Sequence, residues 1–292
     1  MPVRHIALAV LVTAIWGFNF VVIRLGLGSV PPLLLAALRF VVAALPALFL
    51  ARPKVPAARM VAIGMTLFVG QFAFLFPAMK LGMPPGLASV TLQSQAFLTI
   101  LFASVALGER PKPRQLAGAG VAALGLLTIA ATVGGDFTTI GLGLTIASAA
   151  SWAIGNVLMR GADKVDMLAM MVWLSLVPPI PLFLLSLVFE GWPAIVSGVT
   201  GIGMVGAGSV LYLALLATLV GFGLWGFLLK NHPASTVAPF SLLVPLFGTL
   251  SSWLVLGETF SAQRVAGMGL ILLGLATIAL PLPAFAKKQR AA

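Results

Sequence analysis

The sequence predicts an all-α membrane protein whose ten transmembrane helices form two inverted five-helix repeats. Of the 292 residues, 61% are hydrophobic and only 8% are charged, whereas a soluble domain carries about 25% charged residues to cover its surface. The apolar residues fall into runs of about 20, the length that a helix needs to cross the hydrocarbon core of a bilayer. Sequence patterns in the first half of the chain also recur in the second half, as in proteins built from structural repeats.

Ten apolar segments are long enough to span a membrane, and none alternates between polar and apolar residues as a barrel strand would. We therefore expect helices at 5–27, 32–51, 58–79, 85–107, 115–132, 140–160, 167–189, 208–230, 234–256 and 263–283. The glycine-rich stretch at 197–201 predicts a surface turn or a short interfacial helix before the eighth span.

The distribution of Lys and Arg predicts the orientation of the spans. If the N-terminus is cytoplasmic, 13 of the 17 basic residues lie in inner segments. Only Arg24, Lys80 and Arg264 lie at outer ends, and Arg39 lies within the second span. Positive charge gathers on the cytoplasmic side of membrane proteins, so we expect a multi-pass protein of the cytoplasmic (inner) membrane with both termini in the cytoplasm. The net charge of +11 is then explained by topology and not by a nucleic-acid partner.

Two sequence patterns indicate a duplication. Residues 107–126 recur at 256–275 under a shift of 149 positions, and a Trp, Asn and Arg pattern in the first span recurs in the sixth. Because each half holds five spans, an odd number, the halves must be inserted upside down relative to each other. We therefore expect one repeat at residues 1–135 and an inverted one at 136–292. The matching residues are Gly108/Gly257, Glu109/Glu258, Gly118/Gly267, Gly120/Gly269, Gly125/Gly274, Trp16/Trp152 and Asn19/Asn156.

These features resemble the drug/metabolite transporter superfamily, and more narrowly the EamA-type ten-helix exporters, which include bacterial exporters of amino acids, notably aromatic ones. The resemblance covers essentially the whole chain, and it implies alternating access. It also implies a substrate cavity lined by the first, third, fourth, sixth, eighth and ninth helices. The residues that carry the resemblance are Trp16, Asn19, Trp152, Asn156, Glu109 and Glu258.

Polar and aromatic side chains within the spans are the candidates for binding a substrate. Polar groups are costly in lipid, so they usually face the protein interior or a wet cavity. The alternative is a purely structural role, in which Ser and Thr donate hydrogen bonds to helix carbonyls and Trp fills space between helices. The candidate cavity residues are Trp16, Asn19, Gln71, Phe76, Gln95, Trp152, Asn156, Tyr212, Trp225 and Ser241.

A second group of residues is expected to act in gating or structure: Arg39, Pro84, Glu109, Pro233 and Glu258. An intramembrane Arg either snorkels outward or has a partner; for Arg39 the candidate partner is Glu258, and we favour a structural or gating role over binding a substrate carboxylate. Pro84 and Pro233 precede the fourth and ninth spans, where they either begin helices or allow gating. The glycine rows of the fifth and tenth spans suit close helix packing, inside the fold or at a dimer seam.

The sequence favours a carrier over an enzyme. It contains no Cys, no convergent set of catalytic groups and no metal or cofactor motif. We expect a secondary transporter that exports small metabolites, amino acids with aromatic or other apolar side chains above all, as a monomer or weak homodimer. The alternative cargo is a drug or another amphiphilic metabolite, and the alternative class is a channel. No Asp, Glu or His lies in the middle of a span, which favours facilitated export over proton coupling.

Overall fold

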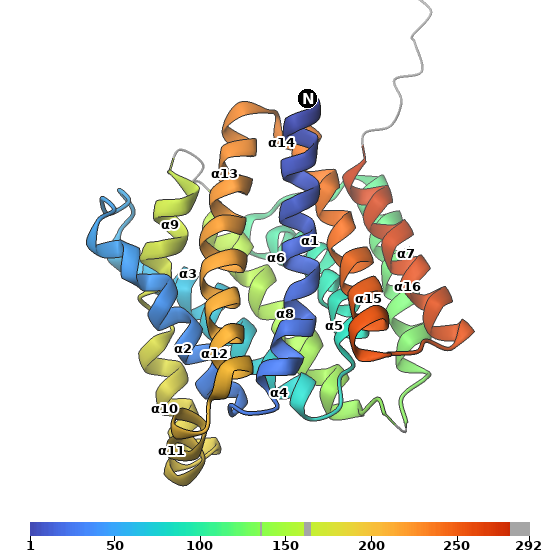
Figure 1. The fold of residues 1–292 in the computed structure, drawn as a ribbon. Helices are drawn as coiled ribbons and strands as arrows, with labels where there is room; N and C mark the ends of the chain where they lie inside the picture. Colours follow the sequence, from blue (N-terminus) through green and yellow to red (C-terminus); the bar gives the residue numbers. More distant parts are fainter. Residues whose placement is uncertain (135, 161–164, 281–292) are drawn as a thin grey trace, which may run out of the picture.

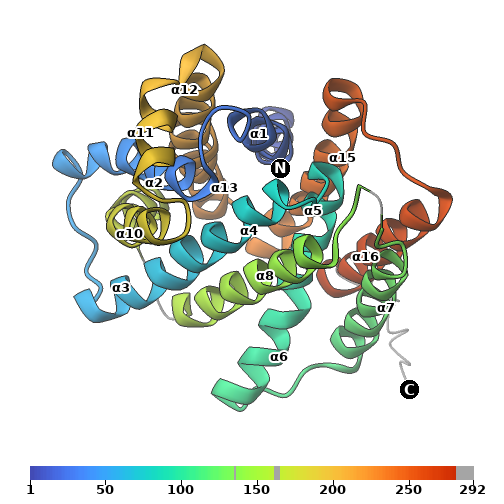
Figure 2. The same ribbon diagram turned by 90° about the horizontal axis from the view of Figure 1, so that it is seen from below.

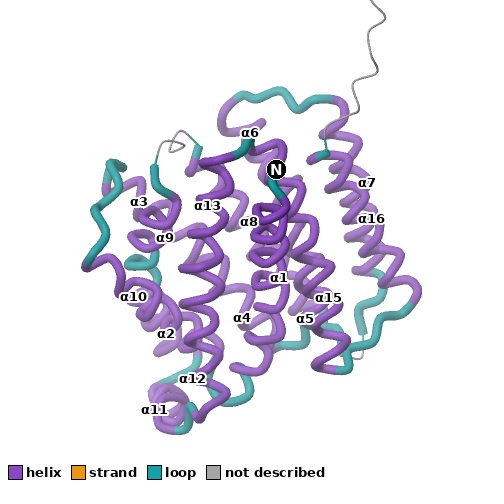
Figure 3. The backbone as a smooth tube through the Cα atoms, turned by 45° about the horizontal axis from the view of Figure 1, so that its top comes forward, coloured by secondary structure: helices purple, strands orange, loops and turns teal. Residues whose placement is uncertain are grey.

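The computed structural model describes residues 1–134, 136–160 and 165–280. Within these residues the chain is helical, and the only β-type pairing is a single bridge between Gly134 and Phe137. Figures 1 and 3 show a bundle that is helical almost throughout. Four of the basic residues used to predict the orientation, Lys164, Lys287, Lys288 and Arg290, lie outside the described residues, as does the end of the tenth expected span.

The first half of the chain contains five helical segments, several of them built from more than one piece. They are α1 (Val3–Gly26); α2 (Pro32–Ala44) with η1 (Leu45–Leu48); α3 (Ala57–Gly64), η2 (Met65–Gly70) and α4 (Gln71–Lys80); α5 (Pro85–Thr91), η3 (Leu92–Ser94) and α6 (Gln95–Leu107); and α7 (Pro113–Ala130).

The second half contains a similar series with one additional short helix. The elements are α8 (Thr139–Met159); α9 (Met167–Leu174) with α10 (Pro179–Phe189); α11 (Trp192–Thr200); α12 (Gly203–Leu211), η4 (Tyr212–Val220) and α13 (Gly221–Asn231); α14 (Ala234–Val237), η5 (Ala238–Leu242) and α15 (Leu243–Leu256); and α16 (Ala262–Ala279). The short helix α11 lies just before the eighth segment and includes residues 197–200 of the stretch for which a turn or short interfacial helix is expected.

Eight helical runs among the described residues are long and apolar enough to cross a membrane, which is the architecture of a multi-pass membrane protein. The second expected span is shorter, at Pro32–Leu48. The fifth corresponds to α7, which has 18 residues and is not one of the eight. Segments therefore exist near all ten expected positions, but eight rather than ten have the length and hydropathy of a full span.

Four of the segments leave α-helical geometry in their middle. The third and eighth contain π-helical stretches, η2 and η4, and the fourth and ninth contain 3₁₀ stretches, η3 and η5. The same kind of interruption thus occurs in the third and fourth segments of each half. π-Helical and 3₁₀ stretches inside helices are frequent at functional sites, because they change the direction of side chains and free backbone carbonyls.

The helices α7 and α16 lie side by side at one edge of the bundle (Figure 2), and glycine lets their backbones touch. A Cβ atom on Gly118 would lie 2.7 Å from the carbonyl oxygen of Gly274, and one on Gly125 would lie 2.6 Å from that of Gly267. These glycines pack inside the fold and not at a dimer seam. In contrast, Gly120 and its counterpart Gly269 face open space.

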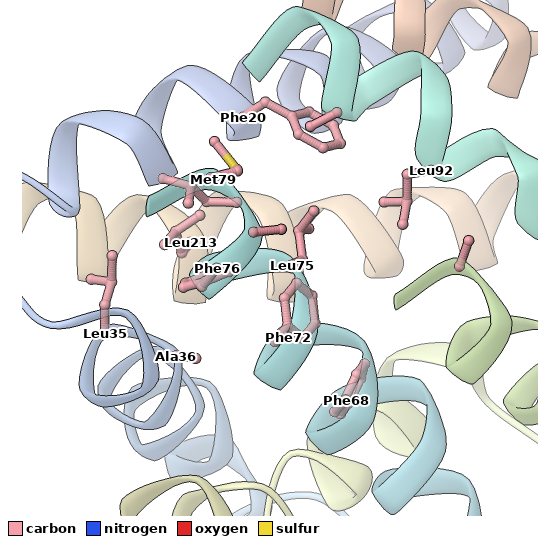
Figure 4. Packing of buried hydrophobic residues seen from close by; sticks show 14 of the residues in the cluster. Phe20, Leu35, Ala36, Phe68, Phe72, Leu75, Phe76, Met79, Leu92 and Leu213 are labelled. Atoms are coloured by element: carbon pink, nitrogen blue, oxygen red, sulfur yellow. The ribbon is translucent and has the colours of Figure 1, made fainter. Parts of the chain in front are cut away.

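Aromatic residues of the third segment form much of the packed core. Phe68 stacks on Phe40 of α2 with 4.8 Å between ring centroids, and Phe72 meets Phe76 edge to face. Figure 4 shows Phe68, Phe72 and Phe76 with Leu75 and Met79 between the surrounding helices. Part of the core therefore lies between α2 and the third segment.

The first residue of α1 and the last described turn of α16 lie at the same end of the bundle (Figure 1). The short helix α11 lies at the opposite end. Both ends of the described chain therefore lie at one end of the bundle.

Candidate functional site

A cavity of about 180 Å³ lies where the interrupted helices meet. Each interruption contributes at least one lining residue, for example Phe68 from η2, Leu92 from η3, Ala217 from η4 and Ser241 from η5. The cavity is lined by Trp16, Asn19, Phe20, Arg39, Phe68, Gln71, Phe72, Leu75, Leu92, Gln93, Gln95, Trp152, Ala217, Phe222, Ser241 and Val244. Its walls are thus mostly apolar and aromatic, with a few polar groups, which is the usual composition of a small-molecule site.

Six of the ten predicted cavity residues line this space, and they come from both halves of the chain: Trp16, Asn19, Gln71, Gln95, Trp152 and Ser241. The first, third, fourth, sixth, eighth and ninth segments all contribute, as the family resemblance implies. The second segment contributes as well, through Arg39.

Trp16 forms the wall on the side of α1. Its indole Nε1 donates a hydrogen bond of 2.9 Å to the carbonyl oxygen of Ala217 in η4. The ring also packs against Phe222 and Trp225, with centroid distances of 5.2 and 5.3 Å. Trp16 is thus fixed on two sides, and Trp225 supports it from behind without lining the cavity.

Amide side chains provide the polar part of the wall. Gln71 begins α4 and is 5% exposed, while Gln95 begins α6. Gln95 Nε2 donates to Gln93 Oε1 over 3.3 Å, and Gln93 also lines the cavity. Sequence reasoning missed Gln93, because in an ideal helix residues two apart point about 200° apart. The interruption η3 removes that constraint.

Three other predicted residues have different surroundings. Phe76 is fully buried in the core. The Tyr212 hydroxyl donates to the carbonyl oxygen of Ile15 over 2.9 Å, which joins η4 to α1. Asn156 Nδ2 donates to Thr99 Oγ1 over 3.2 Å, joining α8 to α6. None of the three lines the central cavity.

Arg39 is 4% exposed and does not snorkel to the surface. Its Nη2 donates to the carbonyl oxygen of Leu213 at 3.1 Å and to Thr218 Oγ1 at 2.8 Å, both in η4. The guanidinium also lies 4.5 Å from the ring centroid of Phe72. The expected pairing with Glu258 is wrong, because Thr218 and Leu213 are nearer partners and Glu258 binds elsewhere.

The two repeat-related glutamates differ in their contacts. Each follows a glycine in the left-handed region, Gly108 with φ 67° and Gly257 with φ 66°. Glu258 Oε2 accepts a hydrogen bond of 2.9 Å from the backbone N–H of Gly86, at the start of α5, and burial raises the pKa of Glu258 above its ordinary value. Glu109 forms an exposed ion pair with Arg160 at the end of α8.

The two predicted gating prolines both precede helices. Pro84 is the N-cap residue of α5, with φ −61° and ψ 137°, and Pro233 directly precedes α14. Both positions agree with prolines that begin helices, because proline lacks the N–H that a helix start leaves unpaired.

A second cavity, of about 440 Å³, lies at the end of the bundle opposite the N-terminus. Its lining includes two basic side chains, Arg24 and Lys80, and two acidic ones, Asp136 and Glu258. The contact between Glu258 and Gly86 lies at this cavity. A charged vestibule therefore adjoins the start of the fourth segment and the end of the ninth.

The sequence profile of the EamA-like transporter family matches residues 3–131 and again residues 139–280. The chain belongs to the EamA-like transporter family. Its apolar helices and bacterial relatives indicate a multi-pass protein of the inner membrane.

Relatives of this EamA-like chain include two bacterial efflux proteins. A probable amino-acid metabolite efflux pump of Salmonella typhimurium is 46% identical over 275 residues, which is 92% of each chain. The protein of the same description from Escherichia coli is 43% identical, again over 92% of each chain. One solved crystal structure has a TM-score of 0.65, covers 95% of this chain and 97% of its own, and shares 20% sequence identity. That likeness shows a common fold.

Proposed function

We propose that this EamA-like transporter exports amino acids with aromatic or other apolar side chains from the cytoplasm by alternating access through the central cavity. The observation that carries the proposal is the cavity itself, because aromatic walls and amide side chains meet there at four helix interruptions. Interrupted helices in transporters place free backbone groups at the substrate site. The names of the relatives, which refer to amino-acid metabolites, support the same substrate class.

We further propose that the chain consists of ten spans in two inverted repeats, 1–135 and 136–292, with both termini in the cytoplasm. The two separate family matches support this division. So does the exchange of glycine contacts between α7 and α16: Gly118 meets Gly274, and Gly125 meets Gly267. A two-fold relation between the halves would produce this exchange, because Gly118 corresponds to Gly267 and Gly125 to Gly274.

The size of the cavity favours a small substrate over a drug. Drug-sized ligands occupy pockets of roughly 300–1,000 Å³, whereas this cavity measures about 180 Å³. An amphiphilic drug would require the helices around the cavity to separate widely. An amino acid requires a smaller rearrangement.

The contacts of the two glutamates support alternating access. Glu258 joins α15 to α5 at the outer end, while Glu109, its counterpart, is paired with Arg160 and is exposed. We interpret this difference as a state that is closed to the outside. In the opposite state, Glu109 would leave Arg160 and bind the start of the ninth segment.

Transport by the purified protein in liposomes tests the proposal. Vesicles preloaded with one unlabelled amino acid are mixed with a labelled panel, with and without a pH gradient. We expect saturable counterflow of apolar and aromatic amino acids. A current proportional to voltage would instead indicate a channel, and counterflow of amphiphilic drugs alone would support the alternative cargo. In vesicles without preloaded amino acid, accumulation above equilibrium only in a pH gradient would replace facilitated export by proton coupling.

A cavity-filling variant provides a matched control. Ser241 lines the cavity, so Ser241→Trp should abolish counterflow. Ser197 lies on α11, and its hydroxyl bonds to Ala194 at the surface, so Ser197→Trp should transport normally. Equal activity of the two variants would show that the substrate does not use this cavity.

A further inference from the structure

Arg39 carries a buried positive charge that no carboxylate of the described residues neutralises. Glu109 and Asp136 pair with Arg160 and Arg264. Glu190 and Asp166 accept backbone hydrogen bonds at the starts of α2 and α9, and Glu258 does so at the start of α5. A charge taken out of water without an opposite charge is costly. The site around Arg39 is therefore electrostatically suited to an anion.

The guanidinium also has unused hydrogen-bond donors. Nη2 makes both of the bonds that hold Arg39 to η4. Nε and Nη1 are buried and have no partner, although buried polar groups in proteins are nearly always hydrogen-bonded. Only Nη2, one of the three guanidinium nitrogens, joins α2 to η4. The other two remain available at a residue that lines the cavity.

Unused acceptors lie around the same cavity. Asn19 Oδ1, Gln71 Oε1 and Gln95 Oε1 are all buried without a partner, and all three residues line the cavity with Arg39. The unpaired donors thus belong to the positively charged guanidinium of Arg39, and the unpaired acceptors belong to neutral amide side chains. A ligand that carries both an anionic and a cationic group would satisfy both sets.

We propose that Arg39 binds the carboxylate of the substrate and that the amide oxygens of Asn19, Gln71 and Gln95 bind its ammonium group. This inference rests on the proposed function and makes it specific: the substrate class is the zwitterionic α-amino acid, and Arg39 determines selectivity for the free carboxylate. It also reverses the role that the sequence favours for Arg39.

The remaining walls then receive the side chain of the substrate. Phe72 covers one face of the guanidinium at 4.5 Å, and Phe68, Leu75 and Phe222 also line the cavity. Such walls exclude water and strengthen the attraction between guanidinium and carboxylate. The guanidinium and the carboxylate both carry a charge, whereas the ammonium group meets neutral amide oxygens, so the carboxylate contributes most to recognition.

Three related compounds test the binding of the carboxylate and the binding of the ammonium group separately. For the amino acid that the liposome panel selects, these are the amino acid, its carboxamide and its deaminated acid, for example phenylalanine, phenylalaninamide and 3-phenylpropionate. Competition against labelled substrate gives their relative affinities. We expect the wild-type protein to bind the amino acid about 10- to 100-fold more tightly than the carboxamide, as for hydrogen bonds to charged groups. Equal affinities would overturn the inference without any variant.

The variant Arg39→Gln tests the residue. It keeps a neutral donor near the position of Nε but removes the charge and the bonds from Nη2. The affinity for the amino acid should therefore fall about 10- to 100-fold while that for the carboxamide stays the same. Arg39→Lys should keep part of the preference. A purely structural role predicts instead that both affinities fall together, as they should in Thr218→Val, which removes a bond to Nη2 and leaves the charge in place.

The outcomes distinguish the two proposals. If the wild-type protein transports no amino acid, the proposed function fails. If the wild-type protein transports amino acids but Arg39→Gln retains the preference for the carboxylate, only the present inference fails. If Arg39→Gln does not fold, two other measurements still test the inference. One is the preference of the wild-type protein for the amino acid over its carboxamide. The other is the variant Gln95→Leu, which should weaken binding of the amino acid but not of 3-phenylpropionate.

Discussion

Glu258 Oε2 at the end of α15 accepts a hydrogen bond of 2.9 Å from the backbone N–H of Gly86 at the start of α5. The bond joins two segments from different halves of the chain beside a charged vestibule. A carboxylate at the first turn of a helix also interacts favourably with the helix dipole. The bond therefore helps to hold these two segments together at this end of the molecule.

Glu258→Ala should open that end. Because the chain has no Cys, the variant Ser89→Cys places a single thiol on α5, at a position that is 1% exposed. We expect a membrane-impermeant thiol reagent added outside to label this Cys about tenfold faster when Glu258→Ala is also present, the change that loss of about 1.4 kcal/mol produces. Glu109→Ala is the matched control and should leave the rate unchanged. Identical rates in all three proteins would show that the Glu258 bond does not hold the end closed.

Tyr212→Phe should lower stability without changing substrate affinity. The hydroxyl bonds to the carbonyl oxygen of Ile15, and Tyr212 does not line the cavity, so its loss should cost about 1 kcal/mol and leave KM unchanged. Trp16→Phe, in contrast, should raise KM because Trp16 does line the cavity. Thermal unfolding in detergent and uptake kinetics measure the two effects. A raised KM in Tyr212→Phe would mean that this hydroxyl reaches the substrate.

Gly118→Val should destabilise the protein, and Gly120→Val should not. A Cβ atom on Gly118 would lie 2.7 Å from a backbone oxygen of α16, whereas one on Gly120 meets nothing within 4 Å. We expect a cost of about 1–3 kcal/mol for Gly118→Val from overpacking and a change within about 0.5 kcal/mol for Gly120→Val. Melting temperatures of the two variants in one detergent provide the comparison. Similar values would place the helix contact elsewhere.

Stability should depend on Asp136 at acid pH. Hydrogen bonds from the Arg264 guanidinium lower the pKa of Asp136 below its ordinary value of 3.8. A lowered pKa in the folded state stabilises the protein above pH 3.8, and this contribution is lost as the pH falls through the lower, folded-state pKa. The stability difference between the wild-type protein and Asp136→Asn should therefore be constant near neutral pH and shrink below about pH 4. A difference that does not change with pH would contradict the ion pair.

Hydropathy and the positions of Pro and Gly predict much of the helical framework. The fourth span is expected at 85–107, and the structure has a helical run at Pro85–Leu107, since Pro85 begins it and Gly108 ends it in the left-handed region. The interruptions inside the spans could not be predicted in this way. η2 and η4 contain no Pro, so the residue that most clearly interrupts a helix does not mark their positions.

The site was predictable to a similar extent. Polarity within apolar spans identifies Asn19, Gln71 and Gln95 as candidates, because such groups avoid lipid. Polarity cannot show that Phe72 lines the cavity whereas Phe76 lies in the core, since an aromatic ring suits both places equally. The partners of Arg39 were not predictable either, because Leu213 and Thr218 are more than 170 residues away in sequence and lie in the π-helical stretch η4.

The exchange of glycine contacts between α7 and α16 limits how the two halves can diverge. At these positions the neighbour of each glycine is the backbone of the other half, and a backbone cannot be made smaller by mutation. A larger residue in one half thus has no compensating substitution in the other. After a duplication, the cavity walls would be free to become different, while this helix pair would have to retain its ancestral sequence pattern in both copies.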